Sequence, residues 1–151
     1  MAQNFGIAWN ATNTASATVP MGSMFATAVV IPGIYEINSG SDATADNAVK
    51  YAILRASARG TASTSVTPQN LDQNGGAAAS TFDTAWNINP TITASSQLLQ
   101  WGQHQRGTYR WVAYDYTKFI RTSAGTGKGV VLNSVVVSSA FNAVFSIQYE
   151  E

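Results

Sequence analysis

The sequence predicts an all-β domain, either a sandwich or a barrel, and three observations carry this prediction. Residues 141–149 alternate between inward apolar and outward positions with a period of two, which is typical of a half-buried strand. Other short runs are rich in β-branched and aromatic residues. Polar turns separate these runs at intervals of about ten to fifteen residues, as in sandwiches and barrels.

The first half of the chain contains three segments that we interpret as strands. Phe5, Ile7 and Trp9 alternate with polar or small residues, so we expect a strand at the N-terminus. Residues 24–31 are apolar on both faces and precede Pro32 and Gly33, which predicts a central strand followed by a turn. Residues 34–37 form a further short strand, which we expect residues 38–41 to close as a turn.

The middle of the chain is ambiguous. Residues 49–59 fit a helix through the spacing of their apolar positions, and they fit a strand equally well through alternation. Residues 60–68 have the composition of a strand or a loop. Residues 77–86 read as a short helix or an extended arm, preceded by a flexible point at Gly75 and Gly76.

The second half of the chain is clearer. Residues 109–114 are aromatic and β-branched, and residues 130–137 are rich in valine, so we expect strands in both. In the last strand we expect Phe141, Phe145, Ile147 and Tyr149 to face the core. Ser146 shares the opposite face with Asn142 and Gln148, which we expect to meet solvent or a neighbouring subunit. We find no repeat and no linker, so residues 1–151 form one domain.

Composition excludes several classes of function. The formal net charge is zero and only 11% of residues are charged, so we expect no nucleic-acid partner. The absence of cysteine removes disulfide scaffolds and thiolate sites. The longest apolar run, residues 24–31, is too short for a bilayer, so we expect no membrane partner. The N-terminus lacks the pattern of a signal peptide, so we expect a soluble protein that is made in the cytoplasm.

Candidate chemical motifs are weak. Residues 123–129 contain Gly127 and Lys128 but fail the phosphate-loop spacing at both ends, which favours a flexible hairpin loop. His104 is the single histidine, and without a nucleophile elbow we interpret it as a surface or interface hydrogen-bonding residue. Asp42 and Asp46 lack a calcium-loop spacing and favour a turn. We therefore expect no catalytic residue, no metal ligand, no cofactor and no enzymatic activity.

The aromatic residues leave two interpretations open. Trp86, Trp101, Trp111 and the tyrosines could line a sugar-binding surface, as in many β-sandwich lectins. The alternative, which we favour, places them in the core or in a subunit interface. The acceptor pattern that starts at Asn10 is a frequent accident in a chain rich in asparagine and threonine.

Several segments together resemble the head decoration, or cement, proteins of tailed bacteriophages. These segments are Arg59-Gly60-Thr61 leading to residues 67–72, the run from His104 to Ala113, the turn at residues 127–130 and the ending at residues 145–151. They cover about two thirds of the chain. The resemblance implies a single jelly roll, usually trimeric, on the outside of the capsid, and it implies that residues 49–59 are a strand. N-terminal residues are then available as an arm that contacts neighbours.

From this resemblance we expect a virion structural protein that binds the assembled head and clamps neighbouring subunits of the major capsid protein, as a homotrimer on the capsid surface. A charge-poor composition agrees, because burying unpaired charge in an interface is costly. The alternative is a carbohydrate-binding or receptor-binding β-sandwich module of a phage fibre, and a small hydrolase ranks third.

Overall fold

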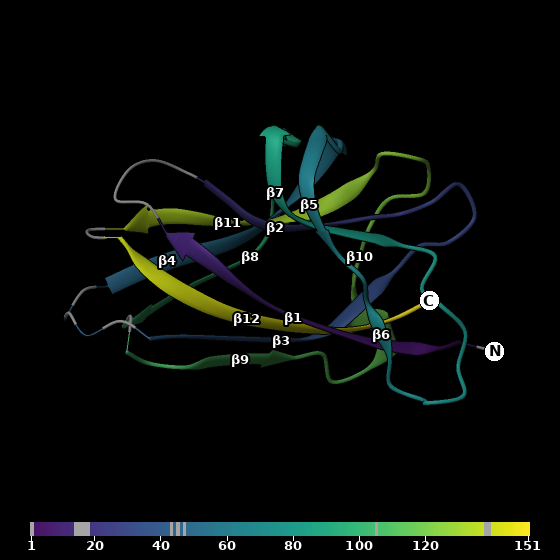
Figure 1. Ribbon diagram of the computed structural model, residues 1–151, viewed down its shortest axis with the longest axis horizontal. Helices are drawn as coiled ribbons and strands as arrows, with labels where there is room; N and C mark the ends of the chain where they lie inside the picture. Colours follow the sequence, from purple (N-terminus) through teal and green to yellow (C-terminus); the bar gives the residue numbers. More distant parts are fainter. Residues whose placement is uncertain are drawn as a thin grey trace.

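The computed structural model describes residues 2–13, 19–42, 44, 46, 48–104, 106–137 and 140–151, and they form two antiparallel sheets packed face to face (Figure 1). Sheet A contains β1 (Asn4–Asn13), β3 (Gly33–Ser41), β6 (Gln69–Asn70), β9 (Tyr109–Val112), β10 (Ile120–Arg121) and β12 (Phe141–Glu150). Sheet B contains β2 (Val19–Phe25), β4 (Ala48–Ala58), β5 (Thr61–Val66), β7 (Thr81–Ile88), β8 (Thr91–His104) and β11 (Gly129–Val137). The prediction of an all-β sandwich is confirmed. Among the described residues, the only helix is the short 3-10 turn η1 (Tyr116–Lys118), and no helix is long and apolar enough to span a bilayer.

The strand pairing is that of a jelly roll. β1 pairs with the last strand β12, β2 pairs with β11, β3 pairs with β9, and β4 pairs with β8. Such nesting of first with last strands is what a long antiparallel hairpin produces when it rolls up into two sheets. Both chain ends lie in sheet A, where the backbone of Gln3 exchanges two hydrogen bonds with that of Glu151, at 3.0 and 2.9 Å.

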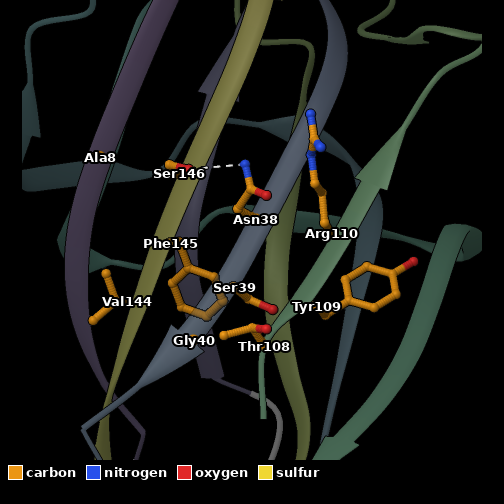
Figure 2. A pocket seen from close by; sticks show the side chains of 10 residues that line it. All are labelled: Ala8, Asn38, Ser39, Gly40, Thr108, Tyr109, Arg110, Val144, Phe145 and Ser146. Atoms are coloured by element: carbon orange, nitrogen blue, oxygen red, sulfur yellow. Dashed lines mark hydrogen bonds between the residues drawn. The ribbon is translucent and has the colours of Figure 1, made fainter.

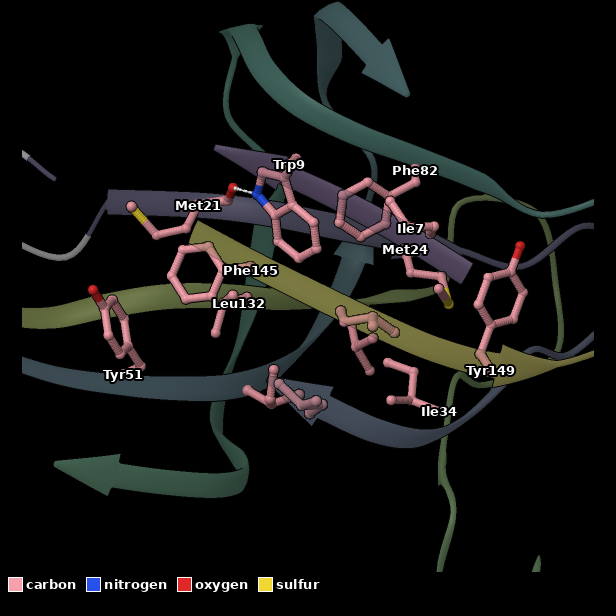
Figure 3. Close-up of a cluster of buried hydrophobic side chains, with 14 of the residues drawn as sticks. Ile7, Trp9, Met21, Met24, Ile34, Tyr51, Phe82, Leu132, Phe145 and Tyr149 are labelled. Carbon is pink, nitrogen blue, oxygen red and sulfur yellow. Dashed lines mark hydrogen bonds between the residues drawn. The ribbon is translucent and has the colours of Figure 1, made fainter. Parts of the chain in front are cut away.

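The main core lies between the sheets and is aromatic at its centre (Figure 3). The Trp9 ring of sheet A stacks on Phe145 with centroids 5.3 Å apart and contacts Phe82 of sheet B at 4.5 Å. The Trp9 indole N–H donates to the Met21 carbonyl at 2.7 Å, so this buried polar group is satisfied across the two sheets. Phe145 also meets the edge of Tyr51 at 5.2 Å. These contacts fix how the two sheets face each other.

At one end of sheet B, β5 and β7 pair with each other and form a two-stranded ribbon that adds to the basic jelly roll. β4 continues into β5 after Arg59 and Gly60, and β7 leads into β8, so Ala58 pairs with Thr91 and Thr61 pairs with Ile88 along one bent ladder. β7 also pairs with β2, and β11 lies between β2 and β4 in the sheet. Figure 1 shows β5 and β7 rising above β2.

Phe25, Ala56 and Val131 form a second small apolar cluster in sheet B. Val131 alternates with Val130 and Leu132 of the main core, so the second cluster lies on the opposite side of sheet B. Asp83 is fully buried there and accepts hydrogen bonds from Arg59 at 2.6 and 2.7 Å and from the Ser65 hydroxyl at 2.6 Å. This paired carboxylate holds the ribbon against the sheet.

Two strand predictions in the first half are wrong in their bounds. The predicted strand at residues 24–31 is instead β2, which starts at Val19 and ends at Phe25. The Thr27 hydroxyl accepts the N–H groups of Val29 and Val30 at 3.4 and 3.1 Å, so a local turn replaces the strand and leaves Val29 88% exposed. The predicted turn at residues 38–41 is instead the end of β3, because that backbone pairs with both β12 and β9.

The other predictions have mixed outcomes. Residues 49–59 are extended, as the resemblance implied, and residues 77–86 contain the start of β7 rather than a helix. The predicted strand at residues 130–137 is confirmed as β11, whereas β9 covers only Tyr109–Val112. Residues 123–128 form a loop, but it connects β10 of sheet A to β11 of sheet B and closes no hairpin. The sequence reading missed β8 altogether.

Candidate functional site

The predicted exposed and buried faces of β12 are confirmed, and the exposed face carries the candidate site. Phe145, Ile147 and Tyr149 are each at most 2% exposed, in the core. Val144 and Ser146 point the other way, onto the outer face of sheet A. They meet Ala8 of β1 and Gly40 of β3 there, because β12 lies between these two strands.

These residues line an open groove of about 410 Å³ on the outer face of sheet A (Figure 2). Its floor is made of small or short side chains: Ala8, Gly40, Val144, Ser146 and Thr108. Val144 is 45% exposed and Val112, further along β9, is 48% exposed. A surface with side chains this short lets another polypeptide approach the backbone of the sheet closely.

A row of polar groups lies at one side of the groove. Arg110 donates two hydrogen bonds to Glu36, at 2.9 and 3.2 Å. The Asn38 amide donates to the same carboxylate at 2.9 Å and to the Ser146 hydroxyl at 3.4 Å. Figure 2 shows Asn38 lying between Ser146 and Arg110. The row is therefore an ordered network whose one negative and one positive charge neutralise each other.

The electrostatics of this row follow from its hydrogen bonds. The Arg110 guanidinium, followed by the Asn38 amide, lowers the pKa of Glu36, because both stabilise the carboxylate. Bonding to Glu36 in turn raises the pKa of Arg110. Both groups are charged at neutral pH, and neither is prepared to exchange a proton. The groove is lined by hydroxyl side chains and by Arg110, whose charge is already neutralised by that of Glu36.

His104 ends β8 and lies on the surface, away from this groove. Its Nε2 is 3.7 Å from an Asp46 oxygen, and its Nδ1 accepts the Arg106 backbone N–H at 3.3 Å. No hydrogen bond joins His104 to a serine in the part of the chain that the structure describes. Asp46 also pairs with Arg106 at 3.3 Å, and Asp42 accepts from Asn142 at 3.3 Å.

The remaining acidic side chains serve the fold. Glu150 pairs with Arg121 at 2.8 Å, and Glu151 accepts the backbone N–H groups of Ala79 and Ser80. Asp115 accepts the Thr117 N–H at the start of η1. Within the described ranges, no three histidine or acidic side chains are grouped so that they could hold a metal ion.

Most of the aromatic residues pack inside the protein. Trp9 and Trp101 are each 6% exposed, and Trp101 stacks on Tyr109 with centroids 4.8 Å apart. The exceptions are Tyr114 and Tyr116, which are 80% and 70% exposed just after β9. Of the tryptophans considered for a sugar-binding surface, Trp101 is buried, Trp111 is partly buried against the core and Trp86 is partly buried, while these two tyrosines stay accessible.

Sequence reasoning missed the polar row and one loop. Glu36 and Asn38 are two residues apart on β3, and that spacing on a strand could have placed them on one face. Residues 70–75 match only the first half of a calcium-loop pattern, with Asn70, Asp72 and Asn74 before a glycine, because Thr81 stands where the pattern needs a glutamate. In the structure the Asn70 amide nitrogen bonds the Gly76 carbonyl at 2.9 Å and the Gln3 side chain at 2.8 Å, so the loop closes on itself.

Comparisons of the chain with protein-family models, with curated proteins and with solved structures found no match.

Proposed function

We propose that this chain is a virion structural protein, a decoration protein that binds the outside of an assembled phage head and clamps neighbouring subunits of the major capsid protein. The observation that carries the proposal is the outer face of sheet A. This face is open, its floor consists of short side chains, and the charges of Glu36 and Arg110 on it are already paired with each other.

Such a face suits protein docking for a physical reason. Binding strips water from both surfaces, and an unpaired charge would lose hydration without compensation. Glu36 and Arg110 keep their partner when the face is covered, so the desolvation cost is small. Val112 and Val144 supply apolar area that gains from burial.

The size of the face argues for several weak contacts acting together. From strand spacing and rise, the surface over β1, β12 and β3 measures about 34 by 14 Å, and the four residues of β9 bring the total to about 550 Å². A standard stable interface buries about 800 Å² on each partner. One face is therefore somewhat small for tight binding, whereas a homotrimer touching three sites gains avidity. Because such a protein binds only the assembled shell, it stabilises that shell by mass action.

The segments that carry the family resemblance support the proposal through their positions. Arg59, Gly60 and Thr61 form the bend of the ribbon, and residues 145–151 include the inner and outer faces of β12. These segments shape the frame of the protein and one wall of the groove. They belong to the parts of the chain that a shared architecture would keep.

Electron microscopy of heads assembled without this chain and then mixed with the purified protein tests the proposal. We expect threefold density on the outside of the shell with sheet A facing inward. Ala8→Arg places a long charged side chain on the exposed groove floor and should abolish binding without unfolding the protein. Thr126→Arg, in an exposed loop, is the matched control. Bare shells, or equal binding by both variants, would contradict the proposal.

A carbohydrate-binding or receptor-binding module of a phage fibre is the second candidate, and the exposure of Tyr114 and Tyr116 favours it. Aromatic rings that face solvent offer apolar faces on which sugar rings can stack. Glycan binding by the native protein that disappears in both Tyr114→Ala and Tyr116→Ala would support this candidate. Glycan binding that both variants retain, or none at all, would remove it.

A further inference from the structure

The outer edge of β8 is unpaired along its length. β8 is the last strand of sheet B and pairs on one side only, with β4. In the described part of the chain, its backbone outside that ladder accepts only three local hydrogen bonds: from Ser57 to Thr91, from Ser96 to Thr93 and from Gly107 to His104. An unpaired edge presents N–H and C=O groups to any strand that comes alongside.

The other terminal strands of the two sheets are short or irregular in the described residues. β6 has two residues, β10 has two and β9 has four, which is too short to template a strand. β5 has six residues, but its ladder with β7 shifts register at three points. Bulges of this kind twist an edge away from pairing. β1 also has a free stretch on its β6 side, from Ile7 to Asn13, because β6 pairs only with Phe5 and Gly6. β8, with 14 residues, is the longest edge strand.

The first part of β8 is irregular, which hinders pairing with a further strand, whereas the stretch from Leu99 to His104 is regular. Near its start, Ser95 has a φ of 54°, and the Ser96 hydroxyl takes the place of a backbone group by accepting the Arg55 N–H at 3.1 Å. From Leu99 to His104 the strand pairs residue for residue with β4, from Ile53 to Ala48. This regular stretch is about 20 Å long. It contains no proline, and none of the acidic, lysine or arginine side chains that usually protect an edge.

A hollow of about 360 Å³ lies over this regular stretch, on the outer face of sheet B. Gly102 forms its floor, and a Cβ there would have only the Val49 carbonyl, at 3.8 Å, within 4 Å. Lys50 is the residue opposite Gly102 on β4, and its ammonium has no partner among the described residues. The nearby Asp46 is already paired with Arg106. The hollow therefore combines free space with one unpaired positive charge.

We propose that the edge of β8 from Leu99 to His104 binds an extended segment of a partner polypeptide by main-chain pairing, with an acidic side chain of that segment lying over Gly102 toward Lys50. An added strand would lie two strand spacings, about 9.6 Å, from β4. A glutamate and a lysine side chain together span that distance. The side-chain pocket selects the segment, while the backbone supplies most of the contact. This site is separate from the groove of sheet A and does not depend on the virion role.

The probe is a capped seven-residue peptide of alternating threonine and valine with glutamate at its centre, and its counterpart carries lysine there. Titrated into the native protein labelled with ¹⁵N, the glutamate peptide should shift the amide signals of residues 99–104. The lysine peptide should bind about threefold to tenfold more weakly, the range expected for an exposed charge pair turned into a repulsion.

Charge exchange makes the test specific. Lys50→Glu should reverse the preference, so that the lysine peptide binds better, while Lys128→Glu on an exposed loop should leave the preference unchanged. Gly102→Val fills the hollow and should weaken the binding of both peptides.

Shifts that map elsewhere, no shifts, or binding that ignores the charge exchange would overturn the assignment. Dilution-dependent shifts of residues 99–104 without peptide would show a second copy of this chain there instead, which also overturns it. Binding to heads can survive each of these failures, so the two proposals are tested apart.

Discussion

Phe145 and Ser146 are neighbours on β12 whose side chains lie on opposite faces of sheet A. Phe145 is 1% exposed and contacts Trp9 and Tyr51, whereas Ser146 lines the open groove. The alternation of a strand makes one residue a core residue and the next a surface residue. At this scale, both stability and the docking chemistry are set by which side of the strand a side chain occupies.

Phe145→Ala should lower the free energy of unfolding by about 3–5 kcal/mol, because it removes a buried ring and leaves a cavity. That is a large share of a total of about 5–15 kcal/mol. Ser146→Ala loses only a long contact with Asn38 and should change stability by less than about 0.5 kcal/mol. Chemical denaturation of the two variants checks this. Equal losses would mean that the assigned faces of β12 are wrong.

The buried tyrosines predict a loss of stability at high pH. Burial raises the pKa of Tyr51 and of Tyr149, because desolvation penalises the phenolate. In the unfolded chain both ionise near pH 10, so the folded state is fully favoured below that pH and loses stability as the pH rises further. Denaturation midpoints measured from pH 8 to pH 11 should fall above about pH 10.

Tyr149→Phe is the variant that isolates this effect. It removes one of the four tyrosines whose pKa is raised, Tyr35, Tyr51, Tyr109 and Tyr149, so the fall in stability above pH 10 should become shallower. At neutral pH the variant is expected to be modestly less stable, since the Ser80 hydroxyl loses its partner at 3.0 Å. An alkaline slope identical to that of the native protein would show that Tyr149 does not contribute.

At the scale of the element, Gly60 makes the bend of the ribbon possible. Gly60 adopts a φ of +74° between β4 and β5, and a Cβ there would lie 2.2 Å from the Ile88 carbonyl oxygen. Gly127, in the loop before β11, has a similar φ of +80° but nothing within 4 Å of the position of its Cβ. Both glycines therefore have the left-handed backbone that favours glycine, but only Gly60 lies close to atoms of another segment.

Gly60→Ala should accordingly cost more stability than Gly127→Ala. In the Gly127 variant, only the left-handed backbone conformation lowers the free energy of unfolding, by about 1–2 kcal/mol. The Gly60 variant must also push β7 away from β5, which should add about 1–3 kcal/mol and loosen the ribbon. Thermal melts give the comparison, and hydrogen exchange of β5 and β7 shows whether the loss is local. Equal costs would mean that the approach of the two strands is not tight.

At the scale of the whole molecule, the two outer faces differ. On the outer side of sheet B, Phe25 and Val131 are buried in a second apolar cluster. The outer side of sheet A stays open around its groove.

We expect the native protein to form a homotrimer, either in solution or on the shell. Val112, Val144 and the exposed tyrosines leave more apolar surface than a small monomer needs. Light scattering should then give a mass near three times that of the 16.0 kDa chain. A 16.0 kDa species at all concentrations would exclude a stable free trimer, and particle microscopy without threefold density would exclude the trimer on the shell.

The sequence by itself determined the class of the fold and the faces of its most regular strands. Strand alternation is a local property that can be recognised without knowing the partner strands. It therefore assigned to the core Phe5, Ile7 and Trp9 of the first strand and Phe145 and Tyr149 of the last.

The tertiary structure alone decided the rest. β8 escaped detection because its regularity comes from pairing with β4, not from its own mixture of threonine, serine and glutamine. Glu36 and Arg110 are 74 positions apart, and only the pairing of β3 with β9 brings them together. The groove and the free edge depend on such long-range register, which no local pattern encodes.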